Sequence, residues 1–147
     1  MKKISSHFLA NLKSNGHRLT KTRIEIIDIM FKNKSHLAAD EILGLLSKRH
    51  LPVNKTTVYR EIEFLCGEGV INELHFDDRK KRYELAGREH HHHLICSDCK
   101  RVEDVLLIPE VLEAEKAQEE KIVKDYHFKI HGHCMEFFGL CDICANK

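Results

Sequence analysis

Two Cys-x-x-Cys pairs, Cys96 with Cys99 and Cys141 with Cys144, constrain the fold of this chain most strongly. A two-residue gap lets both sulfurs of a pair reach the same ion, and two such pairs supply the four thiolates of a tetrahedral zinc site. The alternative is two redox pairs, which would favour a βαβ setting that is absent here. The sequence therefore predicts a structural Zn²⁺ that ties the last strand to the strand after a histidine run and compensates for a small core.

The length and composition indicate a globular protein. A chain of 147 residues can bury one modest core or two small ones. It has 42% hydrophobic residues, only two prolines and no apolar run long enough for a membrane span. Its first residues are too polar for a secretory signal, so we expect a cytoplasmic protein with no membrane partner. In that reducing compartment, six cysteines favour metal binding over disulfides.

Charge divides the chain into a basic half and an acidic half. Residues 1–82 hold 16 Lys or Arg and 10 Asp or Glu, whereas residues 83–147 hold 8 and 13. A basic half is suited to a polyanion, although a solvated basic surface would give the same balance.

The basic half predicts three or four short helices followed by a β-hairpin, the outline of a winged helix-turn-helix domain. Thr20 and Asn54 are suited to cap two of the helices, and the last helix covers residues 55–66. After that helix the hydrophobic period changes to two, and residues 70–76 and 81–85 predict the strands of the hairpin. A short helical bundle would share the helical part of this pattern.

The polar face of the helix before the hairpin is the expected contact with double-stranded DNA, because this helix enters the major groove in winged domains. The expected DNA-binding residues on it are Lys55, Thr56, Thr57, Tyr59 and Arg60. The hairpin adds a basic run suited to phosphates or the minor groove, which consists of Arg79, Lys80, Lys81 and Arg82.

The acidic half predicts three strands and one helix. The expected strands are residues 94–99, 101–108 and 128–141, and the helix between the last two covers residues 109–126, with Pro109 in its first turn.

Four consecutive histidines, residues 90–93, precede the first cysteine pair. If they are extended, alternate side chains point to opposite sides, so the run could serve two metal sites. Each site would need further donors, and the candidates are His36, Glu84, Asp104 and Glu113. The alternative is a solvated histidine loop.

Several motifs occur together over nearly the whole chain. They are Gly16-His17-Arg18-Leu19-Thr20 with Arg23, Thr57-Val58-Tyr59-Arg60, Tyr83-Glu84-Leu85, the histidine run with Cys96 and Cys99, and His133 in HCMEFFGLCDIC. Together they resemble the ferric uptake regulator family of bacterial metal-dependent repressors. The resemblance implies an α+β protein. A winged helix-turn-helix DNA-binding domain over residues 1–85 and a hinge at about 84–89 precede a small α/β dimerisation domain over residues 90–147 with the four-cysteine zinc site.

The resemblance also implies two further metal sites. The regulatory site at the hinge would consist of His36, Glu84, His91, His93 and Asp104. The second site, within the dimerisation domain, would consist of His90, His92, Glu113 and His133. The assignment of Glu113 requires a short insertion after Asp104. Family members often have a carboxylate where His92 stands, which makes this second site richer in nitrogen.

The implied function is a repressor of metal-uptake and metal-homeostasis genes that binds a palindromic, A/T-rich operator as a homodimer. Imidazole and carboxylate donors without thiolate suit Fe²⁺, Mn²⁺, Zn²⁺ or Ni²⁺ as the regulatory ion. Zinc-sensing relatives commonly place a cysteine shortly after the hinge glutamate, where this chain has Ala86 and Gly87. Peroxide-sensing relatives prefer aspartate where this chain has Glu84. Both points favour Fe²⁺, with Zn²⁺, Mn²⁺, zinc-uptake regulation and peroxide-stress regulation as alternatives.

Two other function classes could use the same residues. A metal-dependent hydrolase would need an open water position and a carboxylate base, and the chain lacks the HExxH signature. A redox switch would use the Cys-x-x-Cys pairs. We therefore expect a regulator and not an enzyme.

Overall fold

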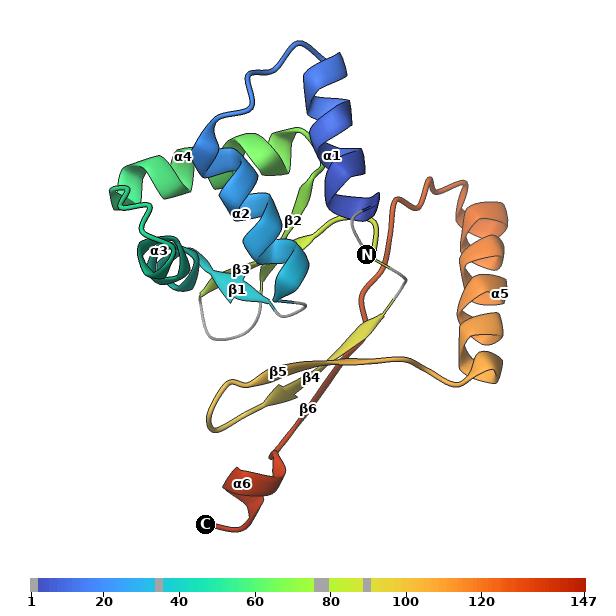
Figure 1. Cartoon of the computed structure of the whole chain (residues 1–147). Helices are drawn as coiled ribbons and strands as arrows, with labels where there is room; N and C mark the ends of the chain where they lie inside the picture. The colour runs from blue at the N-terminus through green and yellow to red at the C-terminus, as the bar shows by residue number, and fades with distance from the viewer. Residues whose placement is uncertain (1–2, 34–35, 76–79, 89–90) are drawn as a thin grey trace. The chain divides into compact units, whose positions relative to one another are not determined.

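The computed structural model describes residues 3–33, 36–75, 80–88 and 91–147. The chain divides into two compact units, Met1–Arg88 and Glu89–Lys147 (Figure 1). The predicted α+β class is confirmed, because each unit combines helices with a three-stranded sheet. Within the described residues, no helix has the length and apolar character that crossing a membrane requires.

The first unit contains four helices and a small antiparallel sheet. The helices are α1 (Lys3–Ser14), α2 (Lys21–Lys32), α3 (Ala39–Lys48) and α4 (Lys55–Gly67). The strands, in the order β1-β3-β2, are β1 (Leu37–Ala38), β3 (Lys81–Leu85) and β2 (Ile71–His75). The predicted hairpin is formed by β2 and β3, with Glu73 opposite Tyr83. The strand β1 was not predicted, because two residues are too few to show the alternation of apolar and polar side chains that indicates a strand.

Side-chain caps start α2 and α4 where the sequence predicts them. The Thr20 hydroxyl accepts a hydrogen bond from the backbone N–H of Arg23 at 3.2 Å, and Asn54 Oδ1 accepts one from the backbone N–H of Thr57 at 2.8 Å. These bonds satisfy N–H groups that have no partner within the helix. Arg23 Nε also pairs with Glu61 Oε2 at 2.8 Å, so the start of α2 is fixed against α4.

One continuous apolar core holds the first unit together. Its buried members are Leu12, Ile26, Ile27, Ile29, Met30, Leu37, Ala39, Ile42, Leu46, Val58, Ile62, Leu65, Val70, Ile71, Tyr83 and Leu85. Val58, Ile62 and Leu65 recur at helical spacing, so they turn one side of α4 inward. The opposite side of α4, which carries the predicted DNA contacts, therefore faces outward.

The second unit is a three-stranded sheet with one long helix. Its elements are β4 (His92–Cys96), β5 (Val102–Val105), α5 (Pro109–Tyr126), β6 (Glu136–Gly139) and α6 (Asp142–Ala145). The central strand β4 pairs antiparallel with β5 and parallel with β6, and α5 stands to the side of the sheet (Figure 1). The prediction of a strand over residues 128–141 was too long. His127 ends α5 in a left-handed conformation, and the following residues carry the chain back to the start of β4 before pairing begins.

Little apolar surface is buried in the second unit. Among residues 91–147, the buried ones are His92, His93, Ile95, Cys96 and Cys144. Large apolar side chains remain exposed, and the exposed fractions of Phe138, Ile143 and Tyr126 are 57%, 62% and 76%. A unit with so small a core requires a metal ion or a partner subunit for its stability.

Candidate metal centres and DNA-binding surface

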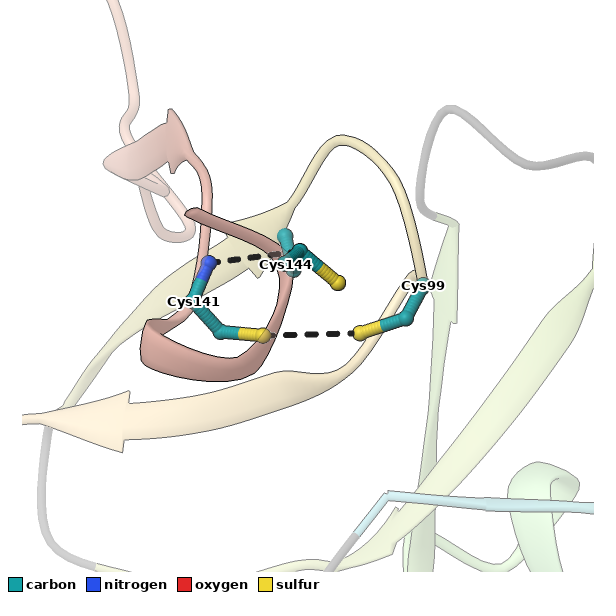
Figure 2. Close-up of side chains that lie close together, drawn as sticks. Cys99, Cys141 and Cys144 are labelled. Carbon is teal, nitrogen blue, oxygen red and sulfur yellow. Dashed lines mark hydrogen bonds between the residues drawn. The ribbon is translucent and has the colours of Figure 1, made fainter. Parts of the chain in front are cut away.

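The four cysteines of the two Cys-x-x-Cys pairs converge where β4 ends. Cys96 is the last residue of β4. Cys99 lies in the following turn, Cys141 is the N-cap of α6 and Cys144 lies within α6 (Figure 2). Their four sulfurs lie within 4.8 Å of one another, with 3.7 Å between the Sγ atoms of Cys99 and Cys141. Four thiol donors this close fit one tetrahedral zinc ion.

Hydrogen bonds shift the pKa values of two thiols in this cluster in opposite directions. The backbone N–H of Cys141 donates to Cys96 Sγ at 3.4 Å, and this bond, together with one from the backbone of Cys99, lowers the pKa of Cys96 to about 6. The side chain of Asp98 raises the pKa of Cys144 through a hydrogen bond to its thiol. The lower pKa of Cys96 favours the thiolate form that zinc binds, and binding of a metal ion to Cys144 would displace its proton.

Three predicted regulatory ligands lie together in the second unit, with His93 on β4, His91 just before β4 and Asp104 on β5. His91, His93 and Asp104 each offer a ligand atom, and these atoms lie within 4.8 Å of one another. His91 Nε2 is 3.8 Å from Asp104 Oδ1, and the rings of His91 and His93 meet edge to face at 5.1 Å. His93 and Asp104 are paired across the two strands. Two imidazoles and one carboxylate are donors that divalent transition metals accept.

The other two predicted regulatory ligands, His36 and Glu84, form a buried pair in the first unit. The pairing of β1 with β3 brings them together, and His36 Nε2 lies 3.4 Å from Glu84 Oε2. Glu84 also accepts hydrogen bonds from Asn72 Nδ2 at 3.4 Å and from Arg88 Nη1 at 3.2 Å. A buried carboxylate surrounded by these donors is held in place for interaction with a cation.

A second cluster joins β4, α5 and the segment before β6. The rings of His92 and His133 stack at 5.7 Å, and Glu115 of α5 contacts both. Its two carboxylate oxygens lie 3.5 Å from His92 Nε2 and 3.5 Å from His133 Nε2. The alternate histidines of the run thus face different clusters: His91 and His93 share one, and His92 belongs to the other.

The carboxylate of this second cluster is Glu115 and not the predicted Glu113. Two residues along an α-helix correspond to a rotation of about 200°. Glu113 is therefore exposed on the other side of α5, whereas Glu115 turns toward the histidines. The fourth predicted member, His90, lies outside the described residues.

The outward face of α4 presents most of the predicted DNA contacts. Lys55, Thr56, Tyr59 and Arg60 are exposed. Lys55 Nζ pairs with Asp40 Oδ1 at 2.9 Å, and this carboxylate raises the pKa of Lys55.

Thr57 differs from the other predicted contacts on α4. It is half-buried, and its hydroxyl donates to Asn54 Oδ1 at 2.8 Å. In this structure the side chain of Thr57 therefore supports the helix cap.

The described basic residues of the hairpin are Lys80, Lys81 and Arg82, and Arg79 lies outside the described residues. Lys80 and Lys81 are exposed, and Arg82 is half-buried. Lys81 Nζ pairs with Glu73 Oε1 across the hairpin at 2.9 Å, which raises the pKa of Lys81. Both lysines are accessible to a phosphate backbone.

Known proteins resemble this chain over nearly its full length. Residues 14–138 match the ferric uptake regulator family. The ferric uptake regulation protein of Bacillus subtilis is 33% identical over 142 residues, covering 92% of this chain and 91% of that protein. The Helicobacter pylori ferric uptake regulator, whose structure reveals three functional metal binding sites, has a TM-score of 0.79 at 28% identity, covering 99% of this chain and 97% of its own. A zinc-bound manganese uptake regulator has a TM-score of 0.69 at 27% identity, covering 91% and 98%. The predicted architecture, a winged helix-turn-helix domain followed by a small α/β domain, is confirmed.

Proposed function

Because the chain belongs to the ferric uptake regulator family, we propose that it is an iron-responsive repressor that binds operator DNA as a homodimer. Members of this family are metal-responsive, DNA-binding transcription regulators and not enzymes, so the metal-dependent hydrolase considered from the sequence is wrong. The proposal adds Fe²⁺ as the effector, metal-uptake genes as the targets and a palindromic, A/T-rich operator as the DNA partner.

The observation that carries the proposal is the convergence of His91, His93 and Asp104 within 4.8 Å, in a chain whose other unit holds the buried pair His36 and Glu84. We infer that one ion takes donors from both groups. Three imidazoles and two carboxylates without a thiolate suit a divalent first-row metal. The bound ion would supply the positive charge that keeps the two carboxylates together.

An ion shared between the units explains why metal would control DNA binding. A two-fold dimer must hold its two recognition helices about one helical turn of DNA apart, or a small multiple of it. Ligands from both units would limit the orientations of the DNA-binding unit and thereby fix this spacing. A coupling of ~1–3 kcal/mol would raise the affinity for DNA about 5–150-fold, and DNA would raise the affinity for metal by the same factor.

The residues that follow Glu84 support iron over zinc as the effector. Ala86 and Gly87 offer no thiolate at the position where zinc-sensing relatives commonly have a cysteine. Glu84 itself stands where peroxide-sensing relatives prefer aspartate. Zinc-uptake, manganese-uptake and peroxide-stress regulation are the alternatives within the family.

A titration of DNA binding against metal ions tests this function. Zinc-loaded protein without other metals is mixed with operator DNA in the absence of oxygen, and each first-row divalent ion is added in turn. We expect Fe²⁺ to raise DNA affinity about 5–150-fold at its cellular concentration. A response to Zn²⁺ alone would identify a zinc regulator, and equal DNA affinity with and without every ion would contradict the switch.

Neutralising residues 79–82 with glutamine is expected to weaken DNA binding at all sequences and to reduce its salt dependence. For each phosphate that the hairpin no longer neutralises, the slope of log affinity against log salt should fall by about 0.9. Fluorescence anisotropy over a range of salt concentrations measures this slope. The matched control neutralises four exposed lysines of the second unit, Lys116, Lys121, Lys124 and Lys129. If the slope is the same in both variants, the hairpin does not contact DNA.

A further inference from the structure

A short contact joins His133 to Glu119 on the outer side of the second cluster. His133 Nδ1 lies 2.7 Å from Glu119 Oε1, while His133 Nε2 lies 3.5 Å from Glu115 Oε1. An ionised carboxylate can only accept a hydrogen bond, and the contact of Nδ1 with Glu119 is within hydrogen-bond distance whereas that of Nε2 with Glu115 is longer. When the imidazole is neutral, its single proton therefore lies on Nδ1. In the neutral imidazole the lone pair then lies on Nε2, on the side of Glu115 and His92.

We propose that Glu119 is a positioning residue that fixes the tautomer of His133 and thereby presents the Nε2 lone pair to a divalent metal ion held with His92 and Glu115. This inference rests on the second metal site. Glu119 is not one of the metal-binding residues His92, Glu115 and His133, and no sequence motif indicated its role.

The helix α5 makes this arrangement possible. Glu115 and Glu119 are four residues apart, so they lie one above the other on the same face of the helix. One helix face therefore places a carboxylate at each of the two nitrogens of His133. This double contact fixes the ring in its plane as well as in its tautomer.

Burial and charge separate the roles of the two carboxylates. The exposed fraction of the side chain is 1% for His92 and 13% for Glu115, but 37% for Glu119. Glu115 thus belongs to the enclosed donor set, whereas Glu119 lies at its edge. Two imidazoles and one carboxylate carry a single negative charge, and Glu119 adds a second beside them. A carboxylate that orients a metal-binding histidine also raises the basicity of its other nitrogen.

The test compares Glu119→Ala with Glu119→Gln, whose amide oxygen can still accept from Nδ1, and with the control Glu120→Ala at the exposed neighbouring position. Nitrogen-15 NMR of the histidine rings, recorded without added metal at a pH high enough for the imidazole to be neutral, reports the tautomer of His133. The affinity for Co²⁺ is measured in zinc-loaded full-length protein that also carries His91→Ala, so that added cobalt reports on the second site.

We expect Nδ1 of His133 to be protonated in the wild type, in Glu119→Gln and in the control. Glu119→Ala should shift the tautomer toward Nε2–H and weaken Co²⁺ binding about 10–100-fold. Glu119→Gln should retain the tautomer and lose less affinity. An unchanged tautomer and affinity in Glu119→Ala would overturn the inference while leaving the metal site intact. A parent protein that takes up no ion at this site would overturn both.

Discussion

Replacing Cys99 by serine is expected to release the structural zinc and to unfold the second unit, while the first unit keeps its fold. A serine hydroxyl does not replace a thiolate in a zinc tetrathiolate. Zinc binding contributes roughly 10–16 kcal/mol in small domains that fold around the ion. The second unit depends on this contribution, because its buried side chains in residues 91–147 are mainly histidines and cysteines. The first unit has its own apolar core and does not need the ion.

Zinc content and hydrogen exchange measure this result. The wild type should retain its zinc after dialysis against a chelator, and Cys99→Ser should lose it. Amides of β4 and β6 should then exchange rapidly, whereas those of α2 and α4 should stay protected. The control is Cys134→Ser, which changes an exposed cysteine of the same unit outside the four-cysteine cluster. A Cys99→Ser variant with slow exchange in β4 would show that the zinc is dispensable for the fold.

Features set by a few neighbouring residues were predictable from the sequence. Thr20 and Asn54 cap their helices as expected, because a cap depends on one side chain and the next three backbone N–H groups. The convergence of the four cysteines was also predictable, because the two-residue gap within each pair lets both of its sulfurs bind one zinc ion. The alternation of His92 with its neighbours follows from the two-residue period of a strand.

Features that depend on the length of a connection were not predictable to the residue. The second cluster uses Glu115 and not Glu113, because the loop between β5 and α5 sets which face of the helix meets the histidines. The strand expected over residues 128–141 is confined to β6, because its pairing with β4 starts only where the chain has returned from α5. Glu119 was also missed. The spacing of two glutamates four residues apart on a helix was the available signal.

His36→Ala and His91→Ala are each expected to remove most of the metal-induced gain in DNA affinity, and the double variant is expected to lose no more than either one. In the proposed site both imidazoles bind the same ion, although they belong to different units. Loss of either ligand breaks the link between the units and removes the coupling of ~1–3 kcal/mol between metal binding and DNA binding. The second substitution then has no coupling left to remove, so the two effects do not add.

Fluorescence anisotropy measures the affinity for operator DNA of the wild type, the two single variants and the double variant. Each protein is measured in the absence of oxygen, with and without saturating Fe²⁺. The control is His131→Ala, an exposed histidine of the second unit that should leave the metal response unchanged. DNA affinity without metal should be equal in all variants, because neither His36 nor His91 belongs to the proposed DNA-binding surface. If the two losses multiply in the double variant, the histidines bind separate ions. If His36→Ala responds fully to metal, the ion is held by the second unit alone, and metal binding must then control DNA binding without a ligand from the DNA-binding unit.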